Sequence, residues 1–306
     1  MPTLRQLSYL VALADESHFG RAAQRLHVTQ PTLSAQVAAL ERKLGADLVE
    51  RGRGPVALTP LGREVADRAR GVLTAVQDIT ELCAAAPHGL AGTIRLGVPA
   101  TLGPYLLPHL VPALHATYPD LRLHVREGKQ DFLRAELMGG RFDLLLTPLP
   151  VPMSGVTEAR LFREPLLVAA PLDHRLAGRG EIARADLAGE RVLGLEPGHH
   201  LHDQVRGLCE SFGATLLRDF EGTSLDTLRQ MVAMGAGLAF LPALYVRSEI
   251  GERGEVAVLR LRRARLERHI GMAWRESSSH DGHFRALADL IRQVARETLP
   301  EVRVDG

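Results

Sequence analysis

Cysteines, aromatic residues and long apolar runs are scarce in this sequence of 306 residues, and the shortages exclude several classes of protein. No apolar run reaches the roughly 18 residues that a membrane-spanning helix needs, and the N-terminus lacks the charged and then apolar pattern of a signal peptide. The two cysteines, Cys83 and Cys209, lie far apart, which favours free thiols over a structural disulfide. We therefore expect a cytoplasmic protein with no membrane partner.

Aromatic residues make up 4% of the chain, so the core must rest on leucine, alanine and valine. The length favours two or three domains.

The net charge is small, but the basic residues are unevenly distributed. A net charge of +1 excludes nucleic-acid binding driven by overall charge alone. Residues 1–63 nevertheless carry eight lysine and arginine residues against five acidic ones. A DNA contact is therefore expected at this end of the chain.

Residues 18–41 have the pattern of a helix-turn-helix. Apolar residues at helical spacing predict a first helix over 3–15, and an alanine-rich second helix follows, whose small side chains allow a close crossing. Thr29 followed by Pro31 is a favourable start for a third helix. The side chains of the third helix that we expect to face inward are Leu33, Val37, Leu40 and Leu44.

Polar residues remain on the outward side at the start of the third helix. Glutamine pairs with adenine, serine and threonine hydroxyls bond to bases or phosphates, and alanine contacts the thymine methyl group. The competing interpretation is that these are ordinary solvated helix residues. Because the whole motif is present, we favour DNA reading, and the expected surface comprises Thr29, Gln30, Pro31, Thr32, Ser34 and Gln36.

A basic β-hairpin follows the third helix. Two short strands around a Gly-Pro turn are predicted within residues 48–59. Arg51 and Arg53 at its tip, with Thr59 at its end, suit contact with the phosphates or the minor groove of double-stranded DNA. The alternative is a solvated basic turn. We predict that the hairpin is the wing of a winged helix-turn-helix.

A long amphipathic helix is predicted from Pro60 to about Ala86. Nothing in the N-terminal module is large enough to cover its apolar stripe, so a partner helix is expected to do so. We therefore expect a homodimer or homotetramer formed through this segment, with Cys83 packed at the seam. Two recognition helices then address the half-sites of a pseudo-palindromic operator.

Beyond a Pro-Gly hinge at 88–92, strand and helix patterns alternate. Such alternation predicts an α/β fold of doubly wound sheets, and two groups of strands indicate two subdomains that flank a cleft. Strands are expected at 93–98, 121–126, 142–146, 166–170, 191–195, 238–241 and 270–274. Helices are expected at 103–117, 131–139, near 200–212 and 224–234, and at about 281–298.

Residues 1–87 resemble the winged helix-turn-helix and linker helix of the LysR-type transcriptional regulators. The resemblance covers the motif, the wing and the linker together. It implies a two-subdomain α/β effector domain shaped like a periplasmic binding protein, with two crossings between subdomains and RNA polymerase as a partner. The expected division is a DNA-binding domain at 1–60, a linker at 61–87, a hinge at 88–92 and an effector domain at 93–306, with subdomain I at 93–165 and 268–300 and subdomain II at 166–267.

Three predicted helix starts lie where the cleft should be. Helix N-termini with hydroxyl groups offer donors to an anion or a small polar molecule. For any single serine or threonine, plain helix capping is the competing interpretation. Together the three starts favour an effector cleft lined by Thr101, Gly198, Thr223 and Ser224.

The segments that begin at Gly103, Gly198 and Thr223 resemble the peroxide-sensing, OxyR-like branch of the family. That branch has a peroxide-reactive cysteine after Gly-His and a resolving cysteine nine residues later. Here His200 occupies the reactive position and Cys209 the resolving one, which excludes the usual intramolecular disulfide because an imidazole forms no sulfenic acid. The resemblance implies a sensor group of His199, His200, Asp203, Cys209 and Arg268, in which Arg268 matches a basic residue that supports the reactive thiolate.

Three interpretations of this sensor group stay open. In the first, hydrogen peroxide oxidises Cys209 alone, to a sulfenic acid or a mixed disulfide. In the second, Cys209 is a buried helix residue and the protein responds to a small-molecule effector without redox chemistry. In the third, His199, His200, His202 and Cys209 bind a metal ion, although neighbours at this spacing do not converge on one ion from a helix. We expect the first, with the second as its alternative, and no cofactor or metal.

An enzyme tethered to a DNA-binding module is the rival from another class. Asp203, His199 and Cys209 nominally form a Cys-His-Asp set. The sequence nevertheless has no nucleophile elbow, phosphate loop or metal-hydrolase motif. We therefore expect a regulator and not an enzyme.

Overall fold

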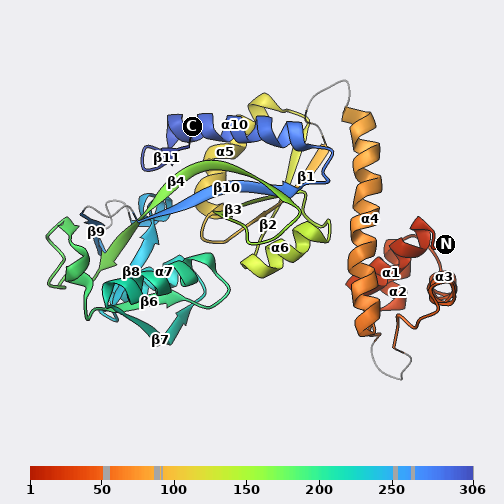
Figure 1. Ribbon diagram of the computed structural model, residues 1–306, viewed down its shortest axis with the longest axis horizontal. Helices are drawn as coiled ribbons and strands as arrows, with labels where there is room; N and C mark the ends of the chain where they lie inside the picture. Colours follow the sequence, from red (N-terminus) through yellow and green to blue (C-terminus); the bar gives the residue numbers. More distant parts are fainter. Residues whose placement is uncertain (51–55, 86–89, 91, 251–253, 263–265, 306) are drawn as a thin grey trace. The chain divides into compact units, whose positions relative to one another are not determined.

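The computed structural model describes residues 1–50, 56–85, 90, 92–250, 254–262 and 266–305, with the backbone alone for 81–85 and 218–221. The chain forms two compact units, each of which is treated by itself. The first comprises Met1–Pro87 and Met138–Arg141, and the second comprises His88–Leu137 and Phe142–Gly306. Figure 1 follows the chain from its red N-terminus to its blue C-terminus.

The first unit begins with a helix-turn-helix whose helices are capped by their own sequence. The helices are α1 (Leu4–Glu16), α2 (Phe19–Arg25) and α3 (Gln30–Leu44). Thr3 forms a capping box at the start of α1, the His18 ring accepts two backbone N–H groups of α2, and Thr29 caps α3. Their apolar sides meet in one core that includes Leu10, Leu13, Ala22 and Leu33.

The inward side of α3 matches the prediction at three of its four positions. Leu33, Val37 and Leu40 are buried, with at most 2% of their surface exposed. Leu44 is 42% exposed, so that part of the prediction is wrong. The helix ends at this residue, because Gly45 adopts a left-handed conformation with φ of 69° and directs the chain away.

A short hairpin leads from α3 into the long helix α4 (Pro60–Ala85). Val49 pairs with Leu58 in an antiparallel bridge, and Glu50 N donates to Ala57 O at 2.8 Å. The predicted tip with Arg51 and Arg53 lies outside the described residues. The hairpin base thus has the strand pairing that the sequence predicted.

Helix α4 presents an apolar surface on its outer side. It has 26 residues and is therefore about 39 Å long. Ala66 and Ala69 are buried against the rest of the unit, and α4 packs on α1. The apolar residues that remain exposed are Leu61 (47%), Val72 (45%), Val76 (38%) and Ile79 (63%).

The second unit contains a mixed sheet in the order β2-β1-β3-β10-β4-β8-β6-β7. Its first half has β1 (Gly92–Val98) parallel to both β2 (Leu121–Glu127) and β3 (Leu144–Leu149), followed by the antiparallel β10 (Glu267–Arg275) and β4 (Val156–Ala170). The helices of this half are α5 (Gly103–Thr117), α6 (Gln130–Met138) and α10 (Asp281–Thr298).

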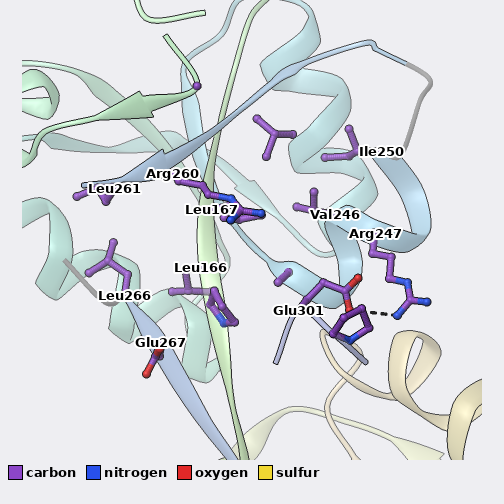
Figure 2. Close-up of a pocket in the computed structure, with 15 residues that line it drawn as sticks. Leu166, Leu167, Val246, Arg247, Ile250, Arg260, Leu261, Leu266, Glu267 and Glu301 are labelled. Atoms are coloured by element: carbon purple, nitrogen blue, oxygen red, sulfur yellow. Dashed lines mark hydrogen bonds and ion pairs between the residues drawn. The ribbon is translucent and has the colours of Figure 1, made fainter. Parts of the chain in front are cut away.

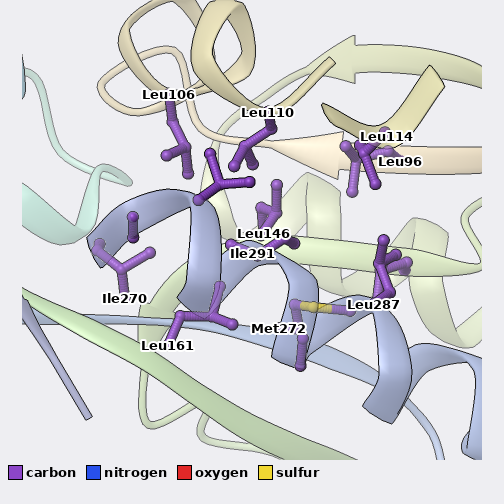
Figure 3. Packing of buried hydrophobic residues seen from close by; sticks show 14 of the residues in the cluster. Leu96, Leu106, Leu110, Leu114, Leu146, Leu161, Ile270, Met272, Leu287 and Ile291 are labelled. Atoms are coloured by element: carbon purple, nitrogen blue, oxygen red, sulfur yellow. The ribbon is translucent and has the colours of Figure 1, made fainter. Parts of the chain in front are cut away.

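Leucine and isoleucine side chains fill the core of this half. Figure 3 shows α5 residues Leu106 and Leu110 on one side of the strands and α10 residues Leu287 and Ile291 near Met272 of β10. All five are buried, with at most 2% of their surface exposed. The scarcity of aromatic residues is thus met by aliphatic packing, as the sequence suggested.

The second half has its own core around a shorter set of strands. These are β5 (Glu181–Ile182), β6 (Arg191–Leu195), β7 (Thr215–Gly222), β8 (Leu238–Pro242) and β9 (Ala257–Leu261). Its helical segments are η1 (Arg184–Leu187), α7 (His200–Phe212), α8 (Leu225–Ala233), α9 (Ala243–Tyr245) and the π-helical turn η2 (Val246–Ile250). A separate apolar cluster lies beneath them.

Strand β4 joins the two halves. Its residues up to Pro165 pair with β10, and from Leu166 onward it pairs with β8 instead. The C-terminal strand β11 (Arg303–Val304) also pairs with β4. Figure 1 shows β4 and β10 running together between the halves.

The predicted fold class is confirmed. Residues 103–117 and 191–195 form the predicted elements with the predicted bounds. Strand β4 starts ten residues earlier than expected, because charged residues interrupt its apolar pattern, and β5, β7, β9 and β11 were missed. In the described part of the chain, no helix is both long and apolar enough to cross a membrane.

Candidate functional site

The start of α3 presents a polar edge that is open on its outer side. The exposed residues are Thr29, Gln30, Pro31, Thr32 and Ser34. The hydroxyl oxygens of Thr29 and Thr32 lie 2.8 Å apart and share a hydrogen bond. Gln36 is only half exposed, and its Oε1 accepts a hydrogen bond from Gln6 Nε2 at 3.2 Å. Gln36 is therefore hydrogen-bonded to α1, and the exposed polar edge is formed by the residues from Thr29 to Ser34.

Thr59 and Glu41 hold the hairpin against the helices. The Thr59 hydroxyl accepts from Gly62 N at 2.9 Å, which caps α4, and donates to Asp47 O at 3.0 Å. The sequence analysis missed Glu41, whose buried Oε1 accepts from Leu48 N at 2.8 Å and Val49 N at 3.0 Å. The sequence did hold a signal for this role, because Glu41 directly follows Leu40, which was expected to face the core.

A charged contact spans the loops that precede α6 and α7. Lys129 Nζ lies 2.9 Å from Glu196 Oε1, and His199 Nε2 lies 3.7 Å from the same oxygen. Gln130 N also donates to Gly198 O at 3.3 Å. Burial is the main reason that the pKa of His199 lies below its ordinary value, although Glu196 opposes the shift. His199 is therefore neutral at pH 7, and Glu196 is the carboxylate that links the two loops.

A fully buried ion pair lies between the two crossing strands. Arg268 Nε of β10 donates to Glu164 Oε2 of β4 at 2.7 Å, and both side chains are at most 1% exposed. Arg268 also donates to the hydroxyl and carbonyl oxygens of Thr101, at 3.1 and 2.8 Å. The other Glu164 oxygen accepts from Leu244 N at 2.9 Å. Each charge is thus hydrogen-bonded, as a buried charge requires.

His200, the first residue of α7, lies within the field of this ion pair. Burial lowers its pKa most, the positive charge of Arg268 lowers it further, and Asp203 partly opposes both. The imidazole is therefore neutral at pH 7. Its Nδ1 is buried and has no hydrogen-bond partner among the described residues. The structure thus joins Thr101 to Arg268 by hydrogen bonds, and the charge of Arg268 acts on His200.

Cys209 lies on the opposite side of α7. Nine residues correspond to two and a half helical turns, so His200 and Cys209 point in opposite directions and are about 13 Å apart along the axis. Cys209 is 2% exposed and belongs to the apolar core of the second half. Burial, aided by Glu210, raises the pKa of its thiol to about 11. Arg268 is held by Glu164 and Thr101, and this arrangement does not favour its expected support of a Cys209 thiolate.

A hollow nevertheless reaches Cys209 from the side of α7 and β7. It has a volume of about 600 Å³ and is lined by His202, Arg206 and Thr215 in addition to Cys209. The His202 ring nitrogen Nδ1 lies 2.6 Å from Leu195 O. The hollow therefore borders Cys209, of which 2% of the surface is exposed.

The other predicted site residues have local roles. Asp203 is exposed and pairs with Arg206 at 3.2 Å. Ser224 caps α8 by accepting from Thr227 N at 3.2 Å, and Thr223 before it is exposed. The capping interpretation therefore fits Ser224. The side chain of Cys83 lies outside the described residues.

The rival constellations do not assemble. Among the residues that the structure describes, no group of three His, Cys, Asp or Glu side chains is placed to hold a metal ion. The nominal Cys-His-Asp set is split, because His199 is directed to Glu196 while Cys209 lies in the core below α7. Glu164, Lys129 and Glu196 were missed as site residues, since the pairs Glu164–Arg268 and Lys129–Glu196 join positions that are remote in the sequence.

Two family models match the chain. The model of the bacterial regulatory helix-turn-helix protein, lysR family, matches residues 4–63. The model of the LysR substrate binding domain matches residues 87–296. The two matches correspond to the helix-turn-helix and to the mixed sheet with its helices.

Whole regulators are similar along nearly their full length. The chain is 42% identical to the DNA-binding transcriptional dual regulator OxyR of Escherichia coli (strain K12), over 94% of each chain. It is 41% identical to the hydrogen peroxide-inducible genes activator of Pectobacterium carotovorum subsp. carotovorum, over 95% of this chain and 96% of that relative.

Two solved structures are similar in fold as well as in sequence. A full-length OxyR variant from Pseudomonas aeruginosa has a TM-score of 0.81 and 39% identity, over 96% of both chains. An H2O2-bound OxyR variant from Corynebacterium glutamicum has a TM-score of 0.66 and 32% identity, over 97% of this chain and 94% of that one.

Proposed function

The chain belongs to the LysR family of bacterial helix-turn-helix regulators, and we propose that it controls transcription as an OxyR-type regulator that responds to hydrogen peroxide. In this role it binds a pseudo-palindromic operator as a homodimer or homotetramer and contacts RNA polymerase. It works in the cytoplasm with the chromosome, and it regulates rather than catalyses. The observation that carries DNA binding is the open polar edge of α3, and the exposed apolar side of α4 supports the oligomer.

We propose the following division of labour along the chain. Residues 1–60 bind DNA, 61–87 form the dimerising helix, 88–92 form a hinge, and 93–306 form the effector domain. Within it, subdomain I is 93–165 with 268–300, and subdomain II is 166–267. The exchange of strand partners between Pro165 and Leu166, and the two separate apolar clusters, support this boundary.

Base reading is proposed for the exposed residues at the start of α3, with Arg51 and Arg53 on the DNA backbone. A Gln30→Ala or Ser34→Ala substitution is expected to relax the base preference at one position of each half-site by about tenfold, because a good side-chain contact to a base contributes about 1–3 kcal/mol. Sequences selected from a random DNA pool measure this. Gln77→Ala on α4, which is exposed and lies about 200° around the helix from Ile79, is the matched control and should leave the selected sequence unchanged. Identical preferences for all variants would remove this edge from base reading.

The response to peroxide is proposed to pass through Cys209. Its thiolate sulfur attacks one oxygen of hydrogen peroxide, the O–O bond breaks, and the second oxygen leaves as hydroxide and takes up a proton. The sulfur loses two electrons and becomes a sulfenic acid, and the peroxide oxygen is reduced. The hollow beside Cys209 supports access, and the raised pKa makes this step slow.

The oxidation of Cys209 is therefore expected to depend steeply on pH. A thiol with a pKa of about 11 is thiolate in about 0.03% of molecules at pH 7.5, so the rate should rise about tenfold per pH unit up to about pH 11. Mass spectrometry after timed peroxide exposure measures the rate in a Cys83→Ser variant, where Cys209 is the remaining thiol. Operator binding by Cys209→Ser should no longer respond to peroxide, whereas Cys83→Ser should respond like the unaltered chain.

A small-molecule effector is the second candidate for the trigger. The buried Nδ1 of His200, which has no hydrogen-bond partner among the described residues and belongs to a ring whose pKa the charge of Arg268 lowers, favours it. Such a regulator needs no thiol. An unchanged peroxide response in Cys209→Ser would refute the redox proposal, and a lack of any response to peroxide in the unaltered chain would leave the effector as the trigger.

A further inference from the structure

A large apolar cavity lies in the second unit, in the half that contains η2 and β9. It has a volume of about 810 Å³, within the range of small-molecule sites. Its wall includes Pro165, Leu166 and Leu167 of β4, where that strand exchanges β10 for β8. None of Thr101, His199, His200, Cys209 or Arg268 lines it. The cavity is therefore a site separate from the candidate sensor.

The rest of the wall includes residues of the π-helical turn η2 and of strand β9, which pairs with β4. Val246 and Ile250 of η2 face the cavity together with Val258 and Leu261 of β9. Figure 2 shows Leu261 and Leu266 on one side of the view and Val246 and Ile250 on the other. π-Helical turns are rare and are frequent at functional sites. The greater part of this wall can contact only an apolar group.

The charged residues of the wall differ in whether they have a partner of opposite charge. Arg247 lies 3.1 Å from Glu301, and Glu267 lies 3.7 Å from Arg303, so both carboxylates already face a cation. Arg260 is exposed, and its guanidinium has no ion-pair or hydrogen-bond partner among the described residues. In Figure 2 its side chain reaches from β9 into the middle of the residues that line the cavity. An unpaired cation thus stands beside an apolar hollow.

We propose that this cavity binds an amphipathic monocarboxylate, with its apolar chain against the walls and its carboxylate on Arg260. An apolar body is favoured because it leaves the aliphatic wall and water together, and a single negative charge is favoured because one cation is free. On one side the ligand contacts Pro165 and Glu267, where β4 pairs with β10. It also contacts Leu167 and Val258, which lie where β4 has left β10 and pairs with strands of the other half. Binding here therefore bridges the two halves of the unit.

Octanoate, with 1-octanol as its uncharged counterpart, tests the proposal in the full-length chain by isothermal titration calorimetry. One octanoate should bind per chain with a dissociation constant on the order of 0.1 mM. Arg260→Gln should weaken octanoate about fivefold, the upper end for an exposed ion pair, and leave octanol unchanged. Arg262→Gln is the matched control. Arg262 directly follows the end of β9, does not line the cavity and lies near Glu181.

A variant with a filled cavity distinguishes binding at this site from binding elsewhere on the chain. Leu261→Trp places an indole ring where the ligand chain would lie and should abolish binding of both probes, with circular dichroism confirming that the variant is folded. The absence of saturable binding to the unaltered chain would overturn the proposal. So would equal octanoate affinity in the unaltered, Arg260→Gln and Leu261→Trp chains, since the probe would then sit at another place.

Discussion

An Ile79→Glu substitution is expected to convert the oligomer into monomers and to weaken binding to a complete operator by about 10²- to 10⁴-fold, the range that a second linked contact contributes. Ile79 is 63% exposed on the apolar side of α4 that also carries Leu61, Val72 and Val76. In a symmetric pair of these helices, the substitution places two like charges in an apolar seam.

Light scattering gives the mass, and gel shifts on a complete site and on a half-site give the two affinities. The half-site affinity should hardly change, since the reading edge of α3 is untouched. Gln77→Glu is the matched control, because two residues along a helix correspond to a rotation of about 200° and Gln77 is exposed. An Ile79→Glu protein that stays dimeric would show that the oligomer forms through another surface.

Arg268→Met is expected to destabilise the second unit by about 3–5 kcal/mol, because it leaves the Glu164 carboxylate buried without its cation. Thr101 would lose two hydrogen bonds in the same step. For a unit of this size the loss corresponds to a melting temperature lower by about 10 °C. The double variant Arg268→Met, Glu164→Leu should recover most of the stability, since both charges are then absent.

Differential scanning calorimetry of the full chain measures the melting temperature of the second unit in each of these variants. Arg285→Met is the control, because Arg285 pairs with Asp281 at 2.8 Å on the surface and its loss should leave the transition in place. If Arg268→Met melted at the same temperature as the unaltered chain, the ion pair would not hold the crossing strands together.

The sequence predicted the elements well wherever the apolar pattern was regular. Helix α5 and strand β6 have clear patterns and the predicted bounds. The first ten residues of β4 were missed because Glu158, Arg160 and Arg163 interrupt the apolar pattern. These side chains are tolerated because half of that stretch lies near the surface. Periodicity reports burial, and a strand that is only partly buried gives a weak signal.

The candidate sensor site was predicted in part. Thr101 was predicted from a helix start at the expected cleft, and His199 and Arg268 followed from the resemblance to the family. Arg268 and Thr101 are joined by hydrogen bonds. Glu164 was missed because it is 104 residues away from Arg268 in the sequence, so only the pairing of β4 with β10 brings them together. The opposite directions of His200 and Cys209, in contrast, follow from helical geometry once α7 is placed.

Selection of bound sequences from a random pool of double-stranded DNA by the unaltered chain tests the central claim most directly. The claim is that the chain reads DNA as a symmetric oligomer through α3. It predicts enrichment of a pseudo-palindrome whose half-sites are centred about 10 base pairs, or a multiple of that, apart. A pool that stays random, or a single half-site without symmetry, would contradict it.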